Sequence, residues 1–415
     1  MRILILYPFL VHAKPANAGL IRVYKLVRYL SDRHQVFVAC FCSDTEKKFL
    51  PYAEPVRQIC QQMVVLPLQH GPGRVGRYWN FVTSLMPNEL MVYGAPEMKS
   101  AVSRLVREEK IDVAHVYYSY MLPFRPALQC PAVVTADEPL FRHWGSQIPF
   151  ATPLGKLRLA VKVAKWRRYE LAMFQKFDHV FTVTEQERQV LSRLLPHVPI
   201  EVSPGSTGTE SFFPLEDVEE EPGTVIFVGN YQNRANIDAA NWLCRSILPR
   251  VRQVVPEAKL YLVGPDLPSS FDKWLKKGDA VATGLVEFPD GVREWLARGA
   301  IFVCPVRVGG GIRGKVLEAM ATGRPVVTTP LGLEGIKAIP GDDVLVAATE
   351  EEFARQVVLL LRDVDLRRRL GERARKAAEV YRTDVAFAAL ERCYEKLIGG
   401  RATGADERVE EWSLG

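Results

Sequence analysis

The sequence contains few of the features that build disulfide frameworks, metal sites or membrane spans. Its seven cysteines form no CxxC pair and do not cluster with the seven histidines. Such a scattered, odd-numbered set indicates free thiols in a reducing compartment and argues against a structural zinc site. No stretch approaches the roughly 18 consecutive apolar residues that a membrane-spanning helix requires. We therefore expect a cytoplasmic or peripheral protein without a structural zinc site.

The N-terminal stretch MRILILYPFLVHA lacks the marks of a secretory signal peptide. Its only leading charge is Arg2, Pro8 interrupts the apolar run, and no small-residue cleavage site follows. A short apolar run of this kind is typical of a buried strand in a parallel sheet. We expect the chain to open with such a strand.

The net charge is too small to indicate a nucleic-acid-binding protein. The formal charge is +6 over 415 residues, with 48% hydrophobic and 25% charged residues. These values are ordinary for a globular protein and are compatible with anionic small molecules or an anionic membrane surface. Because one domain usually has roughly 100–200 residues, two domains are expected.

Strand-like and helix-like segments alternate through both halves of the chain. RILILYPF is followed by NAGLIRVYKLVRYLSD, which has helical spacing of its apolar residues, and the pattern restarts at GTVIFVG after a segment rich in Pro, Gly and acid. Strands that alternate with helices indicate parallel sheets. The prediction is an α/β protein with two Rossmann-like, doubly wound domains and an interdomain cleft. Ligands of such sheets bind beyond the carboxyl ends of the strands.

The same composition changes give the predicted domain boundaries. They are an N-terminal domain at 1–203, a linker at 204–223, a C-terminal domain at 224–380, a helix at 381–400 that packs back on the N-terminal domain, and a tail at 401–415.

A glycine-rich loop late in the chain is the strongest candidate for a ligand site. CPVRVGGGIRGKVLEAMATGRPVV, residues 304–327, runs from an apolar strand through Gly309, Gly310 and Gly311 to a helix expected to begin near Ile312. Glycines let the backbone approach a ligand, and the amino end of a helix favours an anion. Two cations, at Arg313 and Lys315, add full charges there.

Glu318 shares a helical face with Gly311 and Gly314. A carboxylate with room beside it accepts hydrogen bonds from hydroxyls, such as those of a ribose. An ordinary helix cap with surface cations is the alternative. A nucleotide-hydrolase phosphate loop also fits Gly309 to Lys315, but Val316 stands where that motif requires Ser or Thr.

The segment KVLEAMATGRPVVTTPLGLEGI, residues 315–336, resembles the donor helix of the retaining sugar-nucleotide glycosyltransferases of family 4, which have the GT-B fold. VIFVGNYQNRANIDAANWLCRSILPRVRQVVPEAKLYLVG resembles the first unit of their donor domain. VATGLVEFPDGVREWLARGAIFVCPV resembles the segment whose backbone contacts the base. The resemblance covers most of residues 1–395 and is strongest after 223.

This resemblance implies a nucleoside-diphosphate sugar donor bound by the domain at 224–380 and a saccharide or lipid-linked acceptor on the side of the domain at 1–203. It also implies retention of anomeric configuration, no metal and no other cofactor. Arg313, Lys315 and Arg234 would hold the diphosphate, and Glu318 the ribose. The donor-binding residues implied are Gly229, Arg234, Asn236, Val286, Gly310, Gly311, Ile312, Lys315 and Glu318, and the catalytic ones are Arg313, Glu318 and Asp137.

Several positions depart from the family pattern. Gly310 stands where many members have a first Glu, and Asn230 replaces the usual Arg after Gly229, so that Arg234 is the substitute cation. In VVTADEPLFRHW, either Asp137 or His143 is expected to face the cleft, or Asp137 caps a helix.

The early glycine-rich turn of the N-terminal domain is the counterpart of the later glycine loop, and its Gly19 and Arg22 are candidates to approach a phosphate or sugar. The alternative is an ordinary turn with a surface Arg. His115 in DVAHVYYSY is expected to pack within a strand.

A basic amphipathic helix is predicted at 155–176. Arg158, Lys162, Lys165 and Arg168 form a stripe along it. The favoured interpretation is an ordinary helix whose apolar face packs on the sheet and whose basic face is solvated. Because basic amphipathic helices can rest on anionic lipid, peripheral contact of residues 155–176 with the inner face of a membrane is the alternative.

The leading prediction is a glycosyltransferase that builds surface polysaccharide or glycolipid. A sugar-nucleotide isomerase on the same scaffold and a non-catalytic sugar-nucleotide binder are the alternatives. A nicotinamide dehydrogenase is disfavoured because no GxGxxG follows the first strand.

Overall fold

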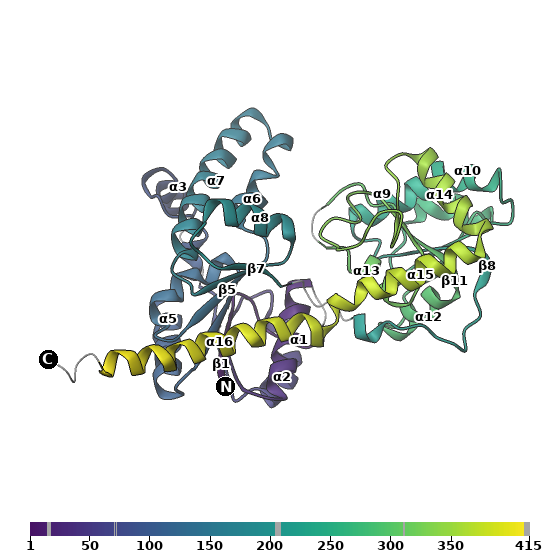
Figure 1. Ribbon diagram of the computed structural model, residues 1–415. Helices are drawn as coiled ribbons and strands as arrows, with labels where there is room; N and C mark the ends of the chain where they lie inside the picture. Colours follow the sequence, from purple (N-terminus) through teal and green to yellow (C-terminus); the bar gives the residue numbers. More distant parts are fainter. Residues whose placement is uncertain (15–17, 70, 72, 204–208, 310–311, 411–415) are drawn as a thin grey trace. The chain divides into compact units, whose positions relative to one another are not determined.

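A computed structural model describes residues 1–14, 18–69, 71, 73–203, 209–309 and 312–410. The chain divides into two compact units, which we describe separately (Figure 1). Unit 1 comprises Met1–Gly205 and Ala386–Gly415, and unit 2 comprises Ser206–Val385. Of the predicted linker, residues 204–208 lie outside the described residues, and the first strand of unit 2 begins at Glu221.

Unit 1 is built on a seven-stranded sheet in the order β3-β2-β1-β4-β5-β6-β7, with all pairs parallel. Its strands are β1 (Arg2–Tyr7), β2 (Gln35–Cys42), β3 (Gln62–Pro67), β4 (Val113–Tyr117), β5 (Ala132–Ala136), β6 (His179–Thr182) and β7 (Ile200–Val202). The first strand is the one expected from the N-terminal apolar run. The order reverses between β1 and β4, so ligands are expected at the carboxyl ends of these two strands.

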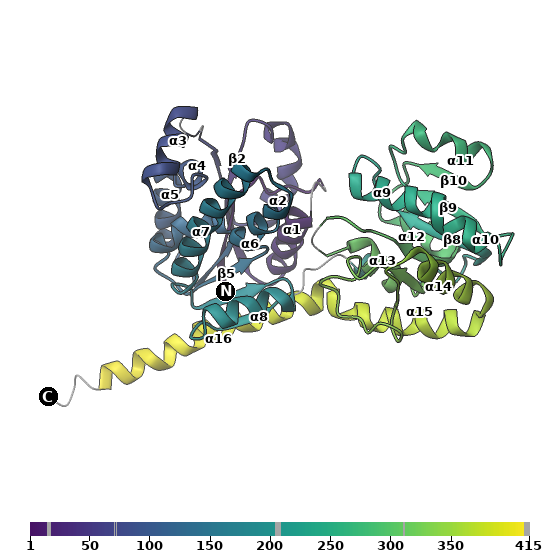
Figure 2. The same ribbon diagram turned by 90° about the horizontal axis from the view of Figure 1, so that it is seen from above.

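Helices cover both faces of this sheet (Figures 1 and 2). They are α1 (Ala18–Ser31), α2 (Glu54–Ile59), α3 (Arg74–Thr83), α4 (Leu90–Tyr93), α5 (Pro96–Glu108), α6 (Leu140–Gly145), α7 (Pro153–Phe174), α8 (Glu185–Leu194) and α16 (Thr383–Glu410). Alternate residues of β1 divide between two cores. Ile3 and Ile5 pack toward α1 and α16, whereas Leu4 and Leu6 pack toward α5 and α7.

Helix α16 places its first turns against the core of unit 1. The Tyr394 hydroxyl lies 2.5 Å from Nδ1 of His115, whose Nε2 lies 2.7 Å from the Thr135 hydroxyl. Burial lowers the pKa of His115 to about 3, so this ring is neutral. His115 therefore has the packing role that its strand position predicted.

Unit 2 is built on a six-stranded parallel sheet in the order β10-β9-β8-β11-β12-β13. The strands are β8 (Glu221–Val228), β9 (Lys259–Val263), β10 (Ala280–Gly284), β11 (Gly299–Cys304), β12 (Val326–Thr328) and β13 (Leu345–Val346). The helices are α9 (Arg234–Trp242), α10 (Leu248–Arg252), α11 (Asp272–Lys276), α12 (Asp290–Arg298), α13 (Gly314–Ala321), α14 (Glu350–Arg362) and α15 (Val364–Ala378). The order reverses between β8 and β11.

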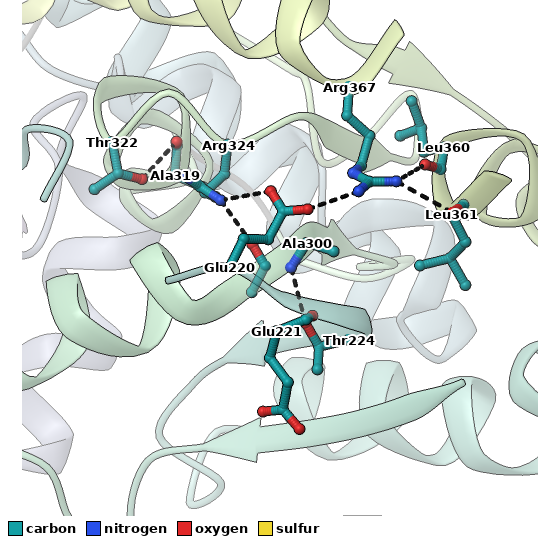
Figure 3. Close-up of polar contacts among 11 residues, drawn as sticks. Glu220, Glu221, Thr224, Ala300, Ala319, Thr322, Arg324, Leu360, Leu361 and Arg367 are labelled. Carbon is teal, nitrogen blue, oxygen red and sulfur yellow. Dashed lines mark hydrogen bonds and ion pairs between the residues drawn. The ribbon is translucent and has the colours of Figure 1, made fainter. Parts of the chain in front are cut away.

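A polar cluster fixes the amino ends of β8 and β11 (Figure 3). Glu220 accepts from Arg324 at 3.0 Å and from Arg367 at 2.7 Å, so its carboxylate lies between two guanidinium groups. The Thr224 hydroxyl accepts from the backbone N–H of Ala300 at 2.8 Å. These bonds hold together the two strands whose opposite ends carry the candidate site.

Candidate active site

The loops that follow β8 and β11 meet at the reversal point of the unit 2 sheet. Nζ of Lys315, in the first turn of α13, donates to Oδ1 of Asn236 on α9 at 2.7 Å. The same ammonium lies 4.7 Å from the centre of the Phe227 ring on β8. Asn236 in turn donates to the carbonyl of Asn230 at 2.8 Å. Two predicted donor-binding residues, 79 positions apart in sequence, are thus in direct contact.

Gly229, which follows β8, lies directly beside the contact between Lys315 and Asn236. A Cβ at this position would lie 3.2 Å from Nζ of Lys315 and 2.9 Å from Cγ of Asn236. Any side chain would press on both groups, so the absence of one allows the ammonium to lie beside the end of β8.

Lys315 is a cation whose protein partner is neutral. None of the ion pairs in the part of the chain that the structure describes involves Lys315, and its hydrogen-bond acceptor is an amide oxygen. Burial lowers the pKa of Lys315, and the neighbouring Arg313 acts in the same direction. An anion bound beside this ammonium would compensate both effects.

Arg313 occupies the N-cap position of α13 with non-helical backbone angles, so this helix begins at Gly314 and not near Ile312 as predicted. A Cβ on Gly309 would lie 3.5 Å from an η nitrogen of Arg313, which places the guanidinium beside the glycine loop. Gly310 and Gly311 lie outside the described residues. The N–H groups of the first turn of α13 and the two cations therefore gather at one helix end.

Glu318 lies one turn further along α13. A Cβ on Gly314 would lie 3.7 Å from its Oε1, so the glycine leaves the carboxylate accessible on that side. Ile312 and Val286 are half-buried and pack on the core of unit 2. Arg234 is the first residue of α9 and is exposed.

Arg307 and Asp238 were missed by the sequence analysis. Arg307 donates to both carboxylate oxygens of Asp238, at 3.1 and 2.7 Å, and its guanidinium lies 4.6 Å from the Trp242 ring centre. This pair ties the loop after β11 to α9. Nothing in the local pattern signals it, because the two residues come from different βα units.

Unit 1 has a second polar cluster, at the carboxyl ends of β1, β4 and β5. Asp137, one residue after β5, accepts from Arg22 on α1 through Oδ1 and from the Tyr118 hydroxyl through Oδ2, the latter at 2.7 Å. Arg22 and Asp137 are mostly buried, with side chains 12% and 21% exposed. The structure therefore brings together Arg22 and Asp137, both predicted.

The position of Tyr118 leaves no room for a side chain at Gly19. A Cβ at Gly19 would lie 2.0 Å from the Tyr118 hydroxyl oxygen, closer than any nonbonded contact allows. Tyr118 has a positive φ of 64°, and its ring lies 5.8 Å from that of Tyr7. Burial raises the pKa of Tyr118, and the Asp137 carboxylate raises it further, so the phenol keeps its proton and donates. Tyr118 and Tyr7 were missed, although YYSY, residues 117–120, stands at the carboxyl end of β4.

His143, the alternative to Asp137, lies outside this cluster. Its Nδ1 is 3.0 Å from Glu138, and its Nε2 is 3.2 Å from the amide nitrogen of Gln147, at the exposed surface. Of the two residues in VVTADEPLFRHW, only Asp137 contacts Arg22 and Tyr118 among the described residues.

A buried carboxylate lies beneath the same loops. Glu170 on α7 accepts from the Ser119 hydroxyl after β4, and from the backbone N–H groups of Leu140 at 2.7 Å and Phe141 at 3.0 Å after β5. Burial raises its pKa to about 7, against the lowering effect of these donors. Glu170 therefore connects the two loops that carry Tyr118 and Asp137.

The predicted basic helix is α7, and part of its stripe faces protein. Lys162 forms an ion pair with Glu89 at 2.5 Å, and Lys165 donates to the carbonyl of Phe81 at 2.6 Å. Trp166 and Phe174 of the same helix are fully buried. The apolar face of α7 thus packs on the core of unit 1. In the described ranges, every helix is too short or too polar to span a bilayer.

Comparison with known proteins agrees with this architecture. The family described as Glycosyl transferase 4-like domain matches residues 20–205, and the family described as Glycosyl transferases group 1 matches residues 222–363. The chain belongs to the GT4-type glycosyltransferases with the GT-B fold. The prediction of an enzyme of this class is confirmed.

Three known proteins illustrate the likeness. An uncharacterized 44.6 kDa protein in the cps region of Klebsiella pneumoniae is 29% identical over 288 residues, which are 65% of this chain and 71% of that protein. Sucrose-phosphate synthase from Thermosynechococcus elongatus superposes with a TM-score of 0.64 at 18% identity, over 96% of this glycosyltransferase and 99% of that chain. HepE of Anabaena in complex with UDP superposes with a TM-score of 0.63 at 14% identity, over 95% of this glycosyltransferase and 100% of that chain.

Proposed function

We propose that this glycosyltransferase moves a sugar from a nucleoside-diphosphate sugar to an acceptor hydroxyl, with retention of anomeric configuration and without a resident metal. The observation that carries the proposal is the Lys315 ammonium, held 2.7 Å from a neutral amide at the amino end of α13. The nearby Glu318 carboxylate favours the charged form of Lys315, and a diphosphate would add an anion bonded directly to the ammonium.

The proposed chemistry needs positive charge where the leaving group forms. As the glycosidic bond breaks, negative charge accumulates on the departing nucleoside diphosphate. Arg313, Lys315 and the N–H groups of the first turn of α13 would stabilise that charge more strongly in the transition state than in the bound donor. Glu318 would accept hydrogen bonds from the ribose, and the exposed Arg234 would add a further cation.

Unit 1 would bind the acceptor. In the Arg22–Asp137–Tyr118 cluster, the carboxylate is already held by a guanidinium and a phenol, so its charge is balanced. Such a group suits neutral hydroxyls better than a second anion. We assign Asp137 to the attacking hydroxyl, with Gly19 and Arg22 keeping it in position.

The comparisons suggest where to begin with substrates. HepE binds UDP, so UDP-sugars are the first donors to test. The Klebsiella relative lies in a cps region, which favours a saccharide or lipid-linked acceptor in surface polysaccharide or glycolipid synthesis on the cytoplasmic side.

A thermal-shift screen tests the proposal. Wild-type protein is melted with UDP-, GDP- and ADP-sugars, and one class should raise the melting temperature by mass action. Arg313→Met and Glu318→Ala should reduce that shift and the turnover, whereas Lys337→Met, at an exposed position in unit 2, should not. Unchanged turnover in both site variants would refute the assignment. The anomeric configuration of the product, read by NMR, tests retention.

A further inference from the structure

An exposed apolar surface covers one end of unit 1. Across the described residues, eight large apolar side chains are more than 60% exposed, and six of them lie on α3, on the segment after it, or on the first turn of α7. The six are Tyr78, Trp79, Val82, Leu85, Leu154 and Leu157. Met86, between α3 and α4, is also exposed. We call these seven side chains the α3–α7 surface.

The two helices of this surface are held side by side. Lys165 of α7 donates to the carbonyl of Phe81 on α3 at 2.6 Å, and Lys162 pairs with Glu89 at 2.5 Å. Phe81 and Glu89 also share the lining of one cavity of about 340 Å³ with Gly155 and Arg158 of α7. Figures 1 and 2 both show α3 beside α7. The apolar side chains thus form one region and not two separate ones.

The surface lies within a strongly basic part of the chain. Residues 74–93 and 151–169 together contain eight Lys and Arg and one acid, Glu89. That acid is already paired with Lys162. Lys156 and Arg158 are exposed beside Leu154 and Leu157. Exposed Trp, Tyr and Leu within a basic rim have the composition of a surface that inserts into an anionic membrane interface.

We infer that the α3–α7 surface docks unit 1 on an anionic lipid bilayer. The aromatic and aliphatic side chains enter the interface, and Lys156 and Arg158 contact lipid phosphates. A second copy of the chain fits less well, because two identical basic surfaces repel each other. This surface differs from the basic stripe considered in the sequence analysis, because Lys162 and Lys165 of that stripe bind within unit 1. The inference is also independent of the proposed donor.

Sedimentation with lipid vesicles tests the inference. The full chain should bind vesicles of phosphatidylcholine and phosphatidylglycerol at 3:1, and bind phosphatidylcholine alone at least about tenfold more weakly. Lys156→Glu with Arg158→Glu should weaken binding by about 25-fold or more, since each surface cation contributes about fivefold. Lys276→Glu with Lys277→Glu, at exposed positions in unit 2, is the matched control.

The apolar part is tested in the same assay. Tyr78→Ser with Trp79→Ser should weaken binding by about tenfold or more, whereas Ile339→Ser, equally exposed in unit 2, should have no effect. Vesicles with brominated acyl chains should quench the Trp79 fluorescence. Trp79→Phe should lose this quenching and keep the binding.

Two measurements separate folding and donor binding from docking. All variants should melt like the wild type and give the same thermal shift with the donor. Equal vesicle binding by the surface variants and their controls would overturn the inference. So would absence of wild-type binding to phosphatidylglycerol vesicles, or a dimer that Tyr78→Ser with Trp79→Ser dissociates without any lipid binding.

Discussion

The two units place polar residues at the same topological position but balance the charges differently. In unit 1 the reversal between β1 and β4 carries Arg22 bonded to Asp137, so cation and carboxylate neutralise each other. In unit 2 the reversal between β8 and β11 carries Lys315 bonded to the neutral amide of Asn236. One architecture therefore provides a balanced site and an electropositive one. The difference is what a hydroxyl acceptor and a diphosphate donor would each require.

Removing the unit 2 cation should have the largest effect. Lys315→Met should lower kcat/KM by about 10²–10³, because a positioned donor is lost where charge develops. Steady-state kinetics with varied donor measures this loss, and Lys337→Met is the control. A Lys315→Met enzyme with wild-type kcat/KM would contradict the claim that the positive charge of Lys315 in unit 2 serves the reaction.

Breaking the balanced pair of unit 1 should reduce stability. Asp137→Asn leaves the Arg22 guanidinium without its counter-charge, at an expected cost of about 3 kcal/mol in the free energy of unfolding. Denaturant unfolding measures this cost. Arg22→Met with Asp137→Asn should recover much of the stability while staying poorly active. If the double variant is as unstable as the single one, charge balance is not what the pair provides.

Glu170 gives unit 1 a pH dependence of its own. Its pKa of about 7 lies above the ordinary value of 4.5, so the folded protein holds a proton that the unfolded chain releases. The free energy of unfolding should fall as pH rises from 5 to 7, with this group contributing about 2 kcal/mol. Glu170→Gln should flatten that part of the curve. An unchanged slope would show that Glu170 titrates in its ordinary range.

The Gly19–Tyr118 contact should give the smallest effect. Gly19→Ala forces a methyl group against the Tyr118 hydroxyl, at an expected cost of about 1–2 kcal/mol. Tyr118→Phe removes the clashing oxygen at the cost of the bond to Asp137, so Gly19→Ala should lower the melting temperature less in a Tyr118→Phe background than in the wild type. An equal loss in both backgrounds would mean that Gly19 is needed for another reason.

Sequence patterns predicted the features that are encoded within short segments of the chain. The alternation of strands and helices gave both sheets, and the glycine loop before α13 identified Lys315 and Arg313 before any contact was visible. Apolar runs and helix-end signals are encoded within a few residues, so they can be read directly. The start of α13 was misplaced by about two residues because the backbone of Arg313 is still non-helical.

The contacts that join distant segments could not be predicted. Tyr118 bonds Asp137, Arg307 bonds Asp238, and Glu170 reaches the loops after β4 and β5. Each pair depends on which strands become neighbours, and topology decides this. The α3–α7 surface escaped notice for the same reason, because the stripe along α7 was judged without the helix that Lys165 holds beside it.

A crystal structure with the nucleoside-diphosphate sugar that gives the largest thermal shift tests the central claim most directly. The account predicts the diphosphate at the amino end of α13, within hydrogen-bond distance of Nζ of Lys315, and the ribose hydroxyls at Glu318. A nucleotide bound elsewhere, with Lys315 still bonded only to Asn236, would contradict it.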